Sequence, residues 1–288
     1  MDLRSIGLGL AFSLMWSSAF TSARIIVQVA PPLTISCIRF LVAGTIAVTV
    51  AYLMGQRITF NRKIIRSITV FGLCQNAIYL GLFFIAMQRL EAGLASIIAS
   101  MMPLLVAAIQ RLVFKQQLPM IGFLGLIVGF GGVCIMMLTR VSGGADLFSL
   151  LLCFIGVAAL SVATLTVRSA SASGNLFMIV GLQMLVGGFA LMPFALLSED
   201  WVFAWTPFSF AAFVYTIFVA GLMATLVWFF LVNRIGPVKA ATFHFLNPFF
   251  GVATAALILD ERLGPIDILG VLTIMAGILA VQLSKARA

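Results

Sequence analysis

Long apolar runs follow one another along the chain, separated by short groups of charged and turn-forming residues. Each run has about twenty residues, which is the length that an α-helix needs to cross the hydrocarbon core of a bilayer. A transmembrane β-barrel would instead alternate apolar and polar positions in segments of about ten residues. The pattern therefore predicts an all-α integral membrane protein with ten transmembrane helices, at residues 5–24, 33–54, 67–88, 93–112, 119–139, 147–167, 175–198, 207–232, 239–259 and 264–284.

Composition supports this class and excludes several functions. Of the 288 residues, 63% are hydrophobic and only 9% are charged, whereas a soluble domain is about half apolar and about a quarter charged. The loops between the runs are too short for a soluble catalytic domain, and the chain has no G-x-x-x-x-G-K-[ST] phosphate loop. With one histidine, no G-x-S-x-G motif and no acid pair within a span, an intramembrane enzyme is also disfavoured. We therefore expect neither an enzyme nor an ATP-driven pump.

The net charge of +9 is explained by topology, with no need for a nucleic-acid partner. If the amino terminus is cytoplasmic, twelve of the 17 basic residues fall on the cytoplasmic side and four on the other. Such a bias follows the positive-inside rule, so both termini are predicted to be cytoplasmic. The remaining base, Arg39, falls inside the second span.

The chain also contains an internal repeat. A shift of 145 residues aligns Pro103 with Pro248 and Gly125 with Gly270, and a shift of 144 aligns Ser17 with Ser161. Five spans per copy is an odd number, so the second copy must enter the membrane from the opposite side. We expect two inverted five-helix repeats, at 1–141 and 146–288, which is the usual basis of alternating access in transporters.

Several motifs resemble the repeat unit of EamA-type transporters, in the drug/metabolite transporter superfamily. They are Tyr79–Ala86, Ile38–Phe40 and the Pro103 segment in the first half, and Val227–Phe230 and Asp260–Leu263 in the second. Where the first unit often carries a glutamate matching Glu261, this chain has Gln116.

The chain is similar overall to bacterial inner-membrane exporters of aromatic and other amino acids. The resemblance implies a multi-pass inner-membrane secondary transporter that exports small organic metabolites, amino acids including aromatic ones. A multidrug or other metabolite carrier of the same fold is the alternative.

Polar and aromatic residues at membrane depth are candidates for the transport path, because unpaired amides are costly in hydrocarbon and aromatic walls suit apolar cargo. The candidate substrate-binding residues are Trp16, Ser17, Asn76, Tyr79, Phe83, Ser100, Ser161, Thr164, Trp228, His244 and Asn247. Each also has a structural interpretation. Rings at helical spacing can be packing contacts, serine and threonine can bond the preceding turn, and His244 can be a neutral residue bonded across helices.

Pro103 and Pro248 are candidate hinges. Each proline lacks an N–H, so it leaves the carbonyl four residues earlier without its helical partner, at Ala99 and His244. Those carbonyls could accept a hydrogen bond from a substrate ammonium. The simpler interpretation is that the prolines only bend their helices.

Charged groups inside the spans limit the coupling mechanism. No acidic residue lies at a predicted mid-membrane position, so a carboxylate proton switch is not expected. We expect transport that is uncoupled, an exchange, or coupled through His244 or backbone groups. We interpret Arg39 mainly as structural, bonding carbonyls at a helix crossing, with contact to a substrate carboxylate as the alternative.

The four cysteines suggest no cofactor. Cys37, Cys74, Cys134 and Cys153 fall inside spans without the spacing of a metal site, and we interpret them as small apolar fillers. No metal or cofactor is expected. The expected partners are a small-molecule substrate and the lipid bilayer, with the protein acting as a monomer.

Overall fold

The computed structural model describes residues 2–57, 62–115, 117–142, 144–166, 175–235, 240, 242–262 and 264–287. Within these ranges the regular structure is entirely helical, without a β-strand. The predicted features Gln116 and Leu263 lie outside the described residues. The elements of the first half are α1 (Leu3–Val27), α2 (Pro32–Leu53), α3 (Arg62–Phe71), η1 (Gly72–Tyr79), α4 (Leu80–Ala86), α5 (Ala92–Ala99), α6 (Met102–Leu112) and α7 (Met120–Ser142). Those of the second half are α8 (Leu147–Thr166), α9 (Leu176–Ser198), α10 (Pro207–Tyr215), η4 (Thr216–Met223), α11 (Ala224–Ile235), η5 (Thr242–Leu246), α13 (Asn247–Leu259) and α14 (Pro265–Arg287).

Eight helical segments among the described residues are long and apolar enough to cross a membrane. Three of them are composite: α3, η1 and α4 form one continuous segment, α10, η4 and α11 another, and α5 and α6 a third. The described apolar stretches of α7 and of η5 with α13 are shorter. Large apolar side chains are exposed on the outer surface, among them Leu197 at 88% and Leu257 at 82%, as expected for positions that face lipid. The predicted all-α membrane class is therefore confirmed.

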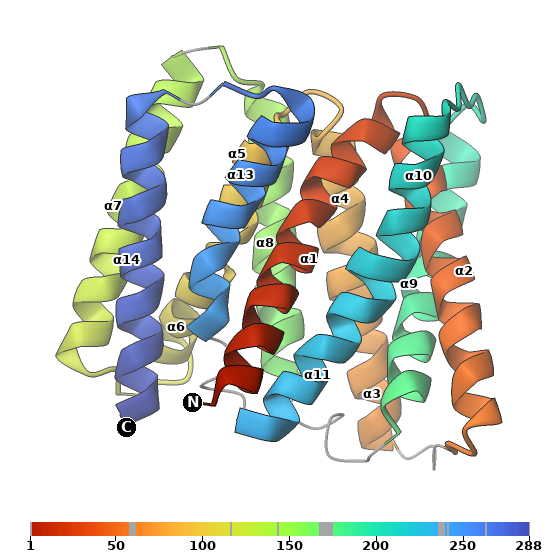
Figure 1. The fold of residues 1–288 in the computed structure, drawn as a ribbon, viewed down its shortest axis with the longest axis horizontal. Coiled ribbons are helices and arrows are strands. Elements are labelled where there is room, and N and C mark those ends of the chain that lie inside the picture. Colours follow the sequence, from red (N-terminus) through yellow and green to blue (C-terminus); the bar gives the residue numbers. More distant parts are fainter. Residues whose placement is uncertain are drawn as a thin grey trace.

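The helices form one bundle whose two chain ends lie at the same end (Figure 1). Helix α1 begins at that end, whereas α8 begins at the opposite one (Figure 1). Contacts between the halves are mirrored: α1 packs on α10, α11 and α13, and α8 packs on η1, α4, α5 and α6. Corresponding helices also pair directly, α2 along α9 and α7 along α14.

Glycines bring these paired helices into close contact. A Cβ built on Gly277 of α14 would lie 2.5 Å from the Cα of Gly129 in α7. In the other pair, a Cβ on Gly44 of α2 would lie 2.9 Å from the carbonyl oxygen of Gly181 in α9. Small residues at such seams are the usual way in which membrane helices gain van der Waals contact, because lipid supplies no hydrophobic force between them.

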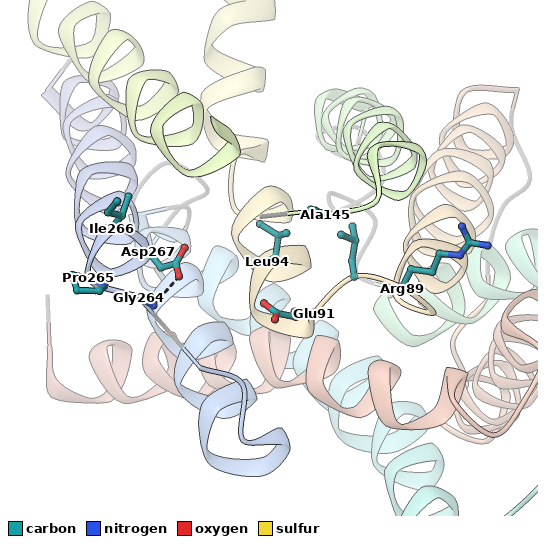
Figure 2. A pocket seen from close by; sticks show the side chains of 10 residues that line it. Arg89, Glu91, Leu94, Ala145, Gly264, Pro265, Ile266 and Asp267 are labelled. Atoms are coloured by element: carbon teal, nitrogen blue, oxygen red, sulfur yellow. Dashed lines mark hydrogen bonds between the residues drawn. The ribbon is translucent and has the colours of Figure 1, made fainter. Parts of the chain in front are cut away.

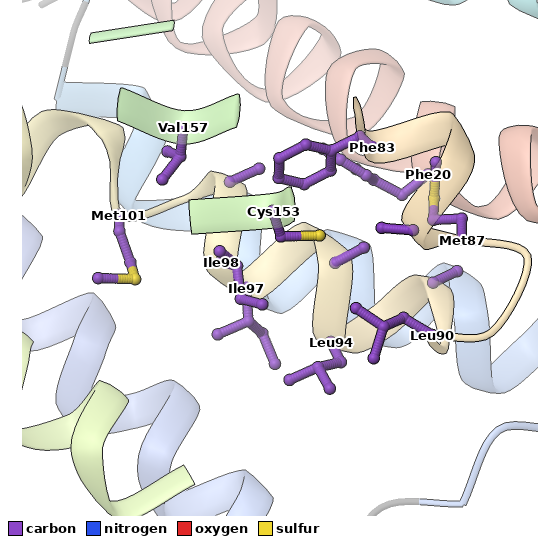
Figure 3. Packing of buried hydrophobic residues seen from close by; sticks show 14 of the residues in the cluster. Phe20, Phe83, Met87, Leu90, Leu94, Ile97, Ile98, Met101, Cys153 and Val157 are labelled. Carbon is purple, nitrogen blue, oxygen red and sulfur yellow. The ribbon is translucent and has the colours of Figure 1, made fainter. Parts of the chain in front are cut away.

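The largest buried cluster lies where α4, α5 and α8 meet α1 (Figure 3). Phe83, Ile98 and Cys153 are fully buried there. Cys153 packs among apolar side chains, as a filler would. Cys37 is also buried, and its thiol donates to the carbonyl of Gly188 at 3.2 Å. Cys74 is half-buried and Cys134 is exposed on the apolar outer surface.

Carboxylates cap helices at the end of the bundle opposite the chain termini. Glu199 accepts from the backbone N–H groups of Leu33 and Thr34 at the start of α2. Glu261 accepts from Ala92 at 2.6 Å and Gly93 at 2.9 Å at the start of α5. Free N–H groups at a helix start carry partial positive charge, so both carboxylates stabilise the helices that they cap.

Hydroxyls within the spans bond mainly to their own helix. Thr225 donates to the carbonyl of Gly221 at 2.6 Å, Thr254 to that of Phe250 at 2.9 Å, and Thr216 to that of Ala212 at 2.6 Å. Each bond spans one turn of the hydroxyl's own helix. Thr216 and Thr254 are also linked to α1, since Thr216 donates to the hydroxyl of Ser22 at 3.3 Å and Thr254 accepts from that of Thr21 at 3.0 Å.

Candidate functional site

A small internal cavity of about 50 Å³ lies between the two halves of the bundle. Its walls come from α1, α2, η1, α4, α9, η4 and α11. The lining side chains that carry polar or aromatic groups are Trp16, Phe20, Arg39, Phe40, Gln75, Asn76, Tyr79, Phe84 and Thr225. Three of the predicted substrate-binding residues, Trp16, Asn76 and Tyr79, are therefore brought together at one cavity.

Two π-helices border this cavity at matched positions of the halves. The bounds of η1 (Gly72–Tyr79) and η4 (Thr216–Met223) differ by the 144-residue offset seen in the sequence. The first supplies Gln75, Asn76 and Tyr79 to the wall, and the second supplies Ala220 and Gly221. Helices of this kind are rare and occur frequently at functional sites, so their position marks this cavity as the candidate site.

Asn76 is fixed by tight packing of η1 on α9. Its side-chain amide donates to the carbonyl of Gln183 at 2.9 Å, and the residue is only 2% exposed. A Cβ on Gly187 would lie 2.3 Å from the Cβ of Asn76, so only glycine permits this approach. The amide is thus satisfied by the protein, and it positions η1 beside the cavity.

Tyr79 forms an aromatic wall of the cavity. It is 1% exposed, and its ring meets that of Phe83 edge to face at 4.7 Å between centroids. Phe83 in turn packs on Phe20 at 5.9 Å and belongs to the buried cluster, not to the cavity wall. Phe83 therefore supports Tyr79 from behind.

Arg39 of α2 lines the cavity and is only 6% exposed. Its guanidinium lies over the rings of Phe40 and Phe84, at 4.5 and 4.9 Å from their centroids. Within the part of the chain that the structure describes, its Nε has no hydrogen-bond partner. The sequence predicted a guanidinium that bonds carbonyls at a helix crossing, but no such bond is present among the described residues. Phe84, on another span, could not be assigned to Arg39 from sequence.

A second aromatic group lies against the cavity at α1. The rings of Phe12, Trp228 and His244 pack together, with centroids 4.8 Å apart for Phe12 and Trp228 and 5.0 Å apart for Trp228 and His244. Trp16 joins the group to the cavity, since its ring is 6.4 Å from that of His244. His244 also pairs through Nδ1 with the side-chain amide of Asn247 at 2.9 Å. Trp228, His244 and Asn247 therefore lie behind the cavity wall.

The predicted hydroxyl candidates lie elsewhere. Ser100, Ser161 and Thr164 each donate to the carbonyl one turn earlier, at 2.7, 2.8 and 2.8 Å. Ser17 is fully buried, and neither its hydroxyl nor the Oδ1 of Asn247 has a partner. None of these residues lines the cavity.

Both candidate hinges occur where a helix is interrupted. Helix α5 ends at Ala99, and α6 begins at Met102 with Pro103 in its first positions. Pro248 likewise follows a short 3₁₀ segment, η5, at the start of α13. The carbonyl of Phe243 accepts from the hydroxyl of Ser13 at 2.9 Å, while Ala99 and His244 are not cavity residues. Hinge motion at the prolines stays a prediction.

A larger hollow of about 460 Å³ is lined by residues of loops and helix ends (Figure 2). Those helix ends lie opposite the chain termini (Figure 1). Figure 2 shows Arg89, Glu91, Leu94 and Asp267 around it. Its polar groups are engaged in holding helix ends: Arg89 pairs with Asp146 at 3.4 Å, and Asp267 accepts from the N–H of Gly264 at 2.9 Å. Neither π-helix lines this hollow, whereas both line the internal cavity. We therefore assign the candidate site to the internal cavity.

Known proteins of similar sequence include transporters. The pattern of the EamA-like transporter family matches residues 3–138 and 147–283. The chain is 24% identical to the inner membrane transporter YedA of Escherichia coli (strain K12), over 96% of this chain and 89% of that one. It is 27% identical to an uncharacterised transporter of Synechocystis, over 89% of this chain and 83% of that one.

Two further comparisons bear on the fold and the extent of the match. A WAT1-related chloroplast protein of Arabidopsis thaliana is 23% identical over 93% of this chain, which spans 66% of that relative's length. A protein crystal structure superposes over 100% of both chains with a TM-score of 0.72 at 15% identity, which supports the fold alone. The long apolar helices and the inner-membrane relatives identify a multi-pass inner membrane protein. Since the family pattern covers both halves, the chain belongs to the EamA-like transporter family.

Proposed function

We propose that this protein is a secondary transporter that exports small organic metabolites, amino acids including aromatic ones, by alternating access through the internal cavity. The observation that carries the proposal is the position of that cavity, which is bordered by both matched π-helices, η1 and η4. Its wall combines aromatic rings with amide, hydroxyl and guanidinium groups. Such a mixture suits a zwitterion with an apolar or aromatic side chain.

The two halves, 1–141 and 146–288, act in this proposal as inverted five-helix repeats with both termini cytoplasmic. The mirrored packing of α1 and α8 on the opposite half supports the repeat, and their starts at opposite ends of the bundle support the inversion (Figure 1). The distribution of basic residues supports the orientation. Exchange of the two halves' conformations would then open the cavity alternately to each side.

The size of the cavity bears on the mechanism. A volume of about 50 Å³ is well below the roughly 300 to 1,000 Å³ of typical ligand pockets. An amino acid is larger than this cavity, so the cavity must widen when cargo enters. The interruptions before Pro103 and Pro248 lie in helices that contact each other, α5 and α13, and are the sites at which we expect this widening.

The proposal leaves out a carboxylate proton relay. The structure describes all eight acidic residues, and Asp2, Asp146, Glu199, Glu261 and Asp267 make their contacts at helix ends or in loops. Transport in this proposal is uncoupled, an exchange, or coupled through His244 or backbone groups, with the protein acting as a monomer in the bilayer and without a cofactor.

The test is uptake into proteoliposomes, with aromatic amino acids, small amino acids, sugars and organic cations offered in turn. Tyr79→Ala should slow transport, and aromatic cargo should lose about 0.5 to 1.5 kcal/mol more than small cargo, because only aromatic cargo loses a ring contact. Tyr52→Ala is the matched control, since Tyr52 is 72% exposed at the end of α2. His244→Ala should act more weakly, because His244 lies behind Trp16. Transport of organic cations alone would instead favour a multidrug carrier.

A further inference from the structure

Arg39 carries a buried charge with no visible counter-ion. Arg39 is only 6% exposed, it lies within a membrane span, and its Nε lacks a hydrogen-bond partner among the described residues. A charge at membrane depth is costly and is normally paired or turned toward a functional cavity. The guanidinium meets only the second condition, since it lines the cavity between the halves.

No acidic side chain is available to pair with Arg39. Glu199 and Glu261 cap α2 and α5 at the end of the bundle. Asp146 pairs with Arg89, and Asp2 pairs with Arg234. Among the residues that the structure describes, which include every acid of the chain, Arg39 forms no ion pair. A negative charge that pairs with it must therefore come from outside the chain.

The contacts of the guanidinium leave its N–H donors for such a partner. Its central carbon lies over the rings of Phe40 and Phe84, 4.5 and 4.9 Å from their centroids, and these cation–π contacts offset part of the cost of burial. Contacts with ring faces use no N–H donor. The donors of a guanidinium form a rigid fork in its plane, which matches the two oxygens of a carboxylate.

We propose that Arg39 binds the carboxylate of the transported molecule. This inference rests on the proposed function and narrows its substrate class to organic acids, amino acids among them. Asn76 and Tyr79 line the same cavity, and Trp16 offers a ring to the rest of the cargo. Organic cations without an acidic group are rejected, because they would meet a buried positive charge.

Matched ligands that differ only at the acid provide the test. We would measure the melting temperature of the purified protein in detergent with phenylalanine or phenylalaninamide, and with 3-phenylpropionate or 3-phenylpropanamide. A ligand that binds the folded state raises this temperature by mass action. The wild-type protein should bind each carboxylate at least about tenfold more tightly than its amide. Phenylalanine uptake into proteoliposomes is measured in parallel.

Three variants separate binding from folding. Arg39→Met should abolish the preference for carboxylates and leave the melting temperature without ligand unchanged or higher, because the lost charge has no partner in the protein. Arg39→Lys should restore part of the preference, since lysine supplies the charge without the fork. Arg111→Met, which removes an exposed guanidinium at the end of α6, should leave the preference intact.

The outcomes are distinct. Equal binding of acids and amides by the wild-type protein, or binding of neither, would overturn the assignment of Arg39. A lower melting temperature of ligand-free Arg39→Met, with both ligands weakened equally, would show a structural role and overturn it too. Binding of 3-phenylpropionate without uptake of phenylalanine would keep the Arg39 site and refute amino-acid export. Uptake of phenylalanine by a protein with no carboxylate preference would support amino-acid transport and refute the Arg39 site.

Discussion

The seam between α7 and α14 allows a sharp prediction for Gly277→Ala. The new Cβ would lie 2.5 Å from both the Cα and the N of Gly129 and 2.7 Å from the carbonyl oxygen of Gly125. Carbon atoms pack at about 3.5 to 4.0 Å, so the helices would have to separate by about 1 Å. All three contacted atoms are backbone, and no rotamer change can relieve the clash.

The expected loss of stability is about 1 to 3 kcal/mol, the usual cost of overpacking a well-packed interface. The assay is thermal unfolding of the purified protein in detergent micelles, where this loss corresponds to a melting temperature lower by roughly 2 to 10 °C. Gly131→Ala is the matched control on the same helix pair. Gly131 is exposed on α7, and a Cβ there would meet nothing within 4 Å. It should be neutral or slightly stabilising, because alanine favours helix.

The comparison refutes the reasoning if Gly277→Ala melts no lower than Gly131→Ala. That result would mean that the two helices are not in backbone contact at Gly129. A loss in both variants would instead point to a general requirement for glycine in these helices, independent of the seam.

Two further predictions concern the ends of the bundle. Glu261→Ala should destabilise the protein by about 1.5 to 3 kcal/mol, because it leaves the N–H groups of Ala92 and Gly93 without their charged acceptor. Asp200→Ala, which removes an exposed acid, is the control. Equal melting temperatures of the two variants would contradict the capping role of Glu261. A cysteine placed at Ser198, with the four native cysteines replaced by alanine, should react with a membrane-impermeant maleimide added to intact cells. Reaction only from the cytoplasmic side would reverse the proposed topology.

The span positions could be predicted because the thickness of the bilayer determines both the sequence pattern and the helix length. The second span was predicted at 33–54 and occurs at Pro32–Leu53, and the seventh was predicted at 175–198 and occurs at Leu176–Ser198. The family resemblance was also confirmed, over both halves. Pattern arguments of this kind need no knowledge of which helices are neighbours.

The internal geometry of the spans could not be predicted in the same way. A π-helix differs from an α-helix by one residue in its hydrogen-bond spacing, and Gly72–Tyr79 shows no periodicity that distinguishes the two. Reasoning from the cost of buried amides did select Asn76, which lines the cavity. The same reasoning selected Asn247, which pairs with His244 behind the wall. Only the arrangement of the helices shows that Asn76 lines the cavity and that Asn247 does not.

The surroundings of Arg39 show the same limit. Phe40 was visible as its neighbour in sequence, but the second ring, Phe84, comes from another span. The missing partner of Nε is likewise a property of the assembled bundle. Sequence could show that a cation lies within a span, and only the fold shows that nothing in the described chain neutralises it.

The hydroxyls that bond within their own helices bear on the speed of conformational exchange. When such a helix slides or rotates past its neighbours, bonds like those of Thr225 to Gly221 and Ser161 to Val157 travel with it unbroken. Polar links between helices, such as Ser13 to Phe243 and Asn76 to Gln183, must instead break and re-form. Hydroxyl bonds within a helix therefore lower the activation barrier for motion of one helix relative to another. The hydrogen bonds between helices determine which arrangements of the bundle are stable.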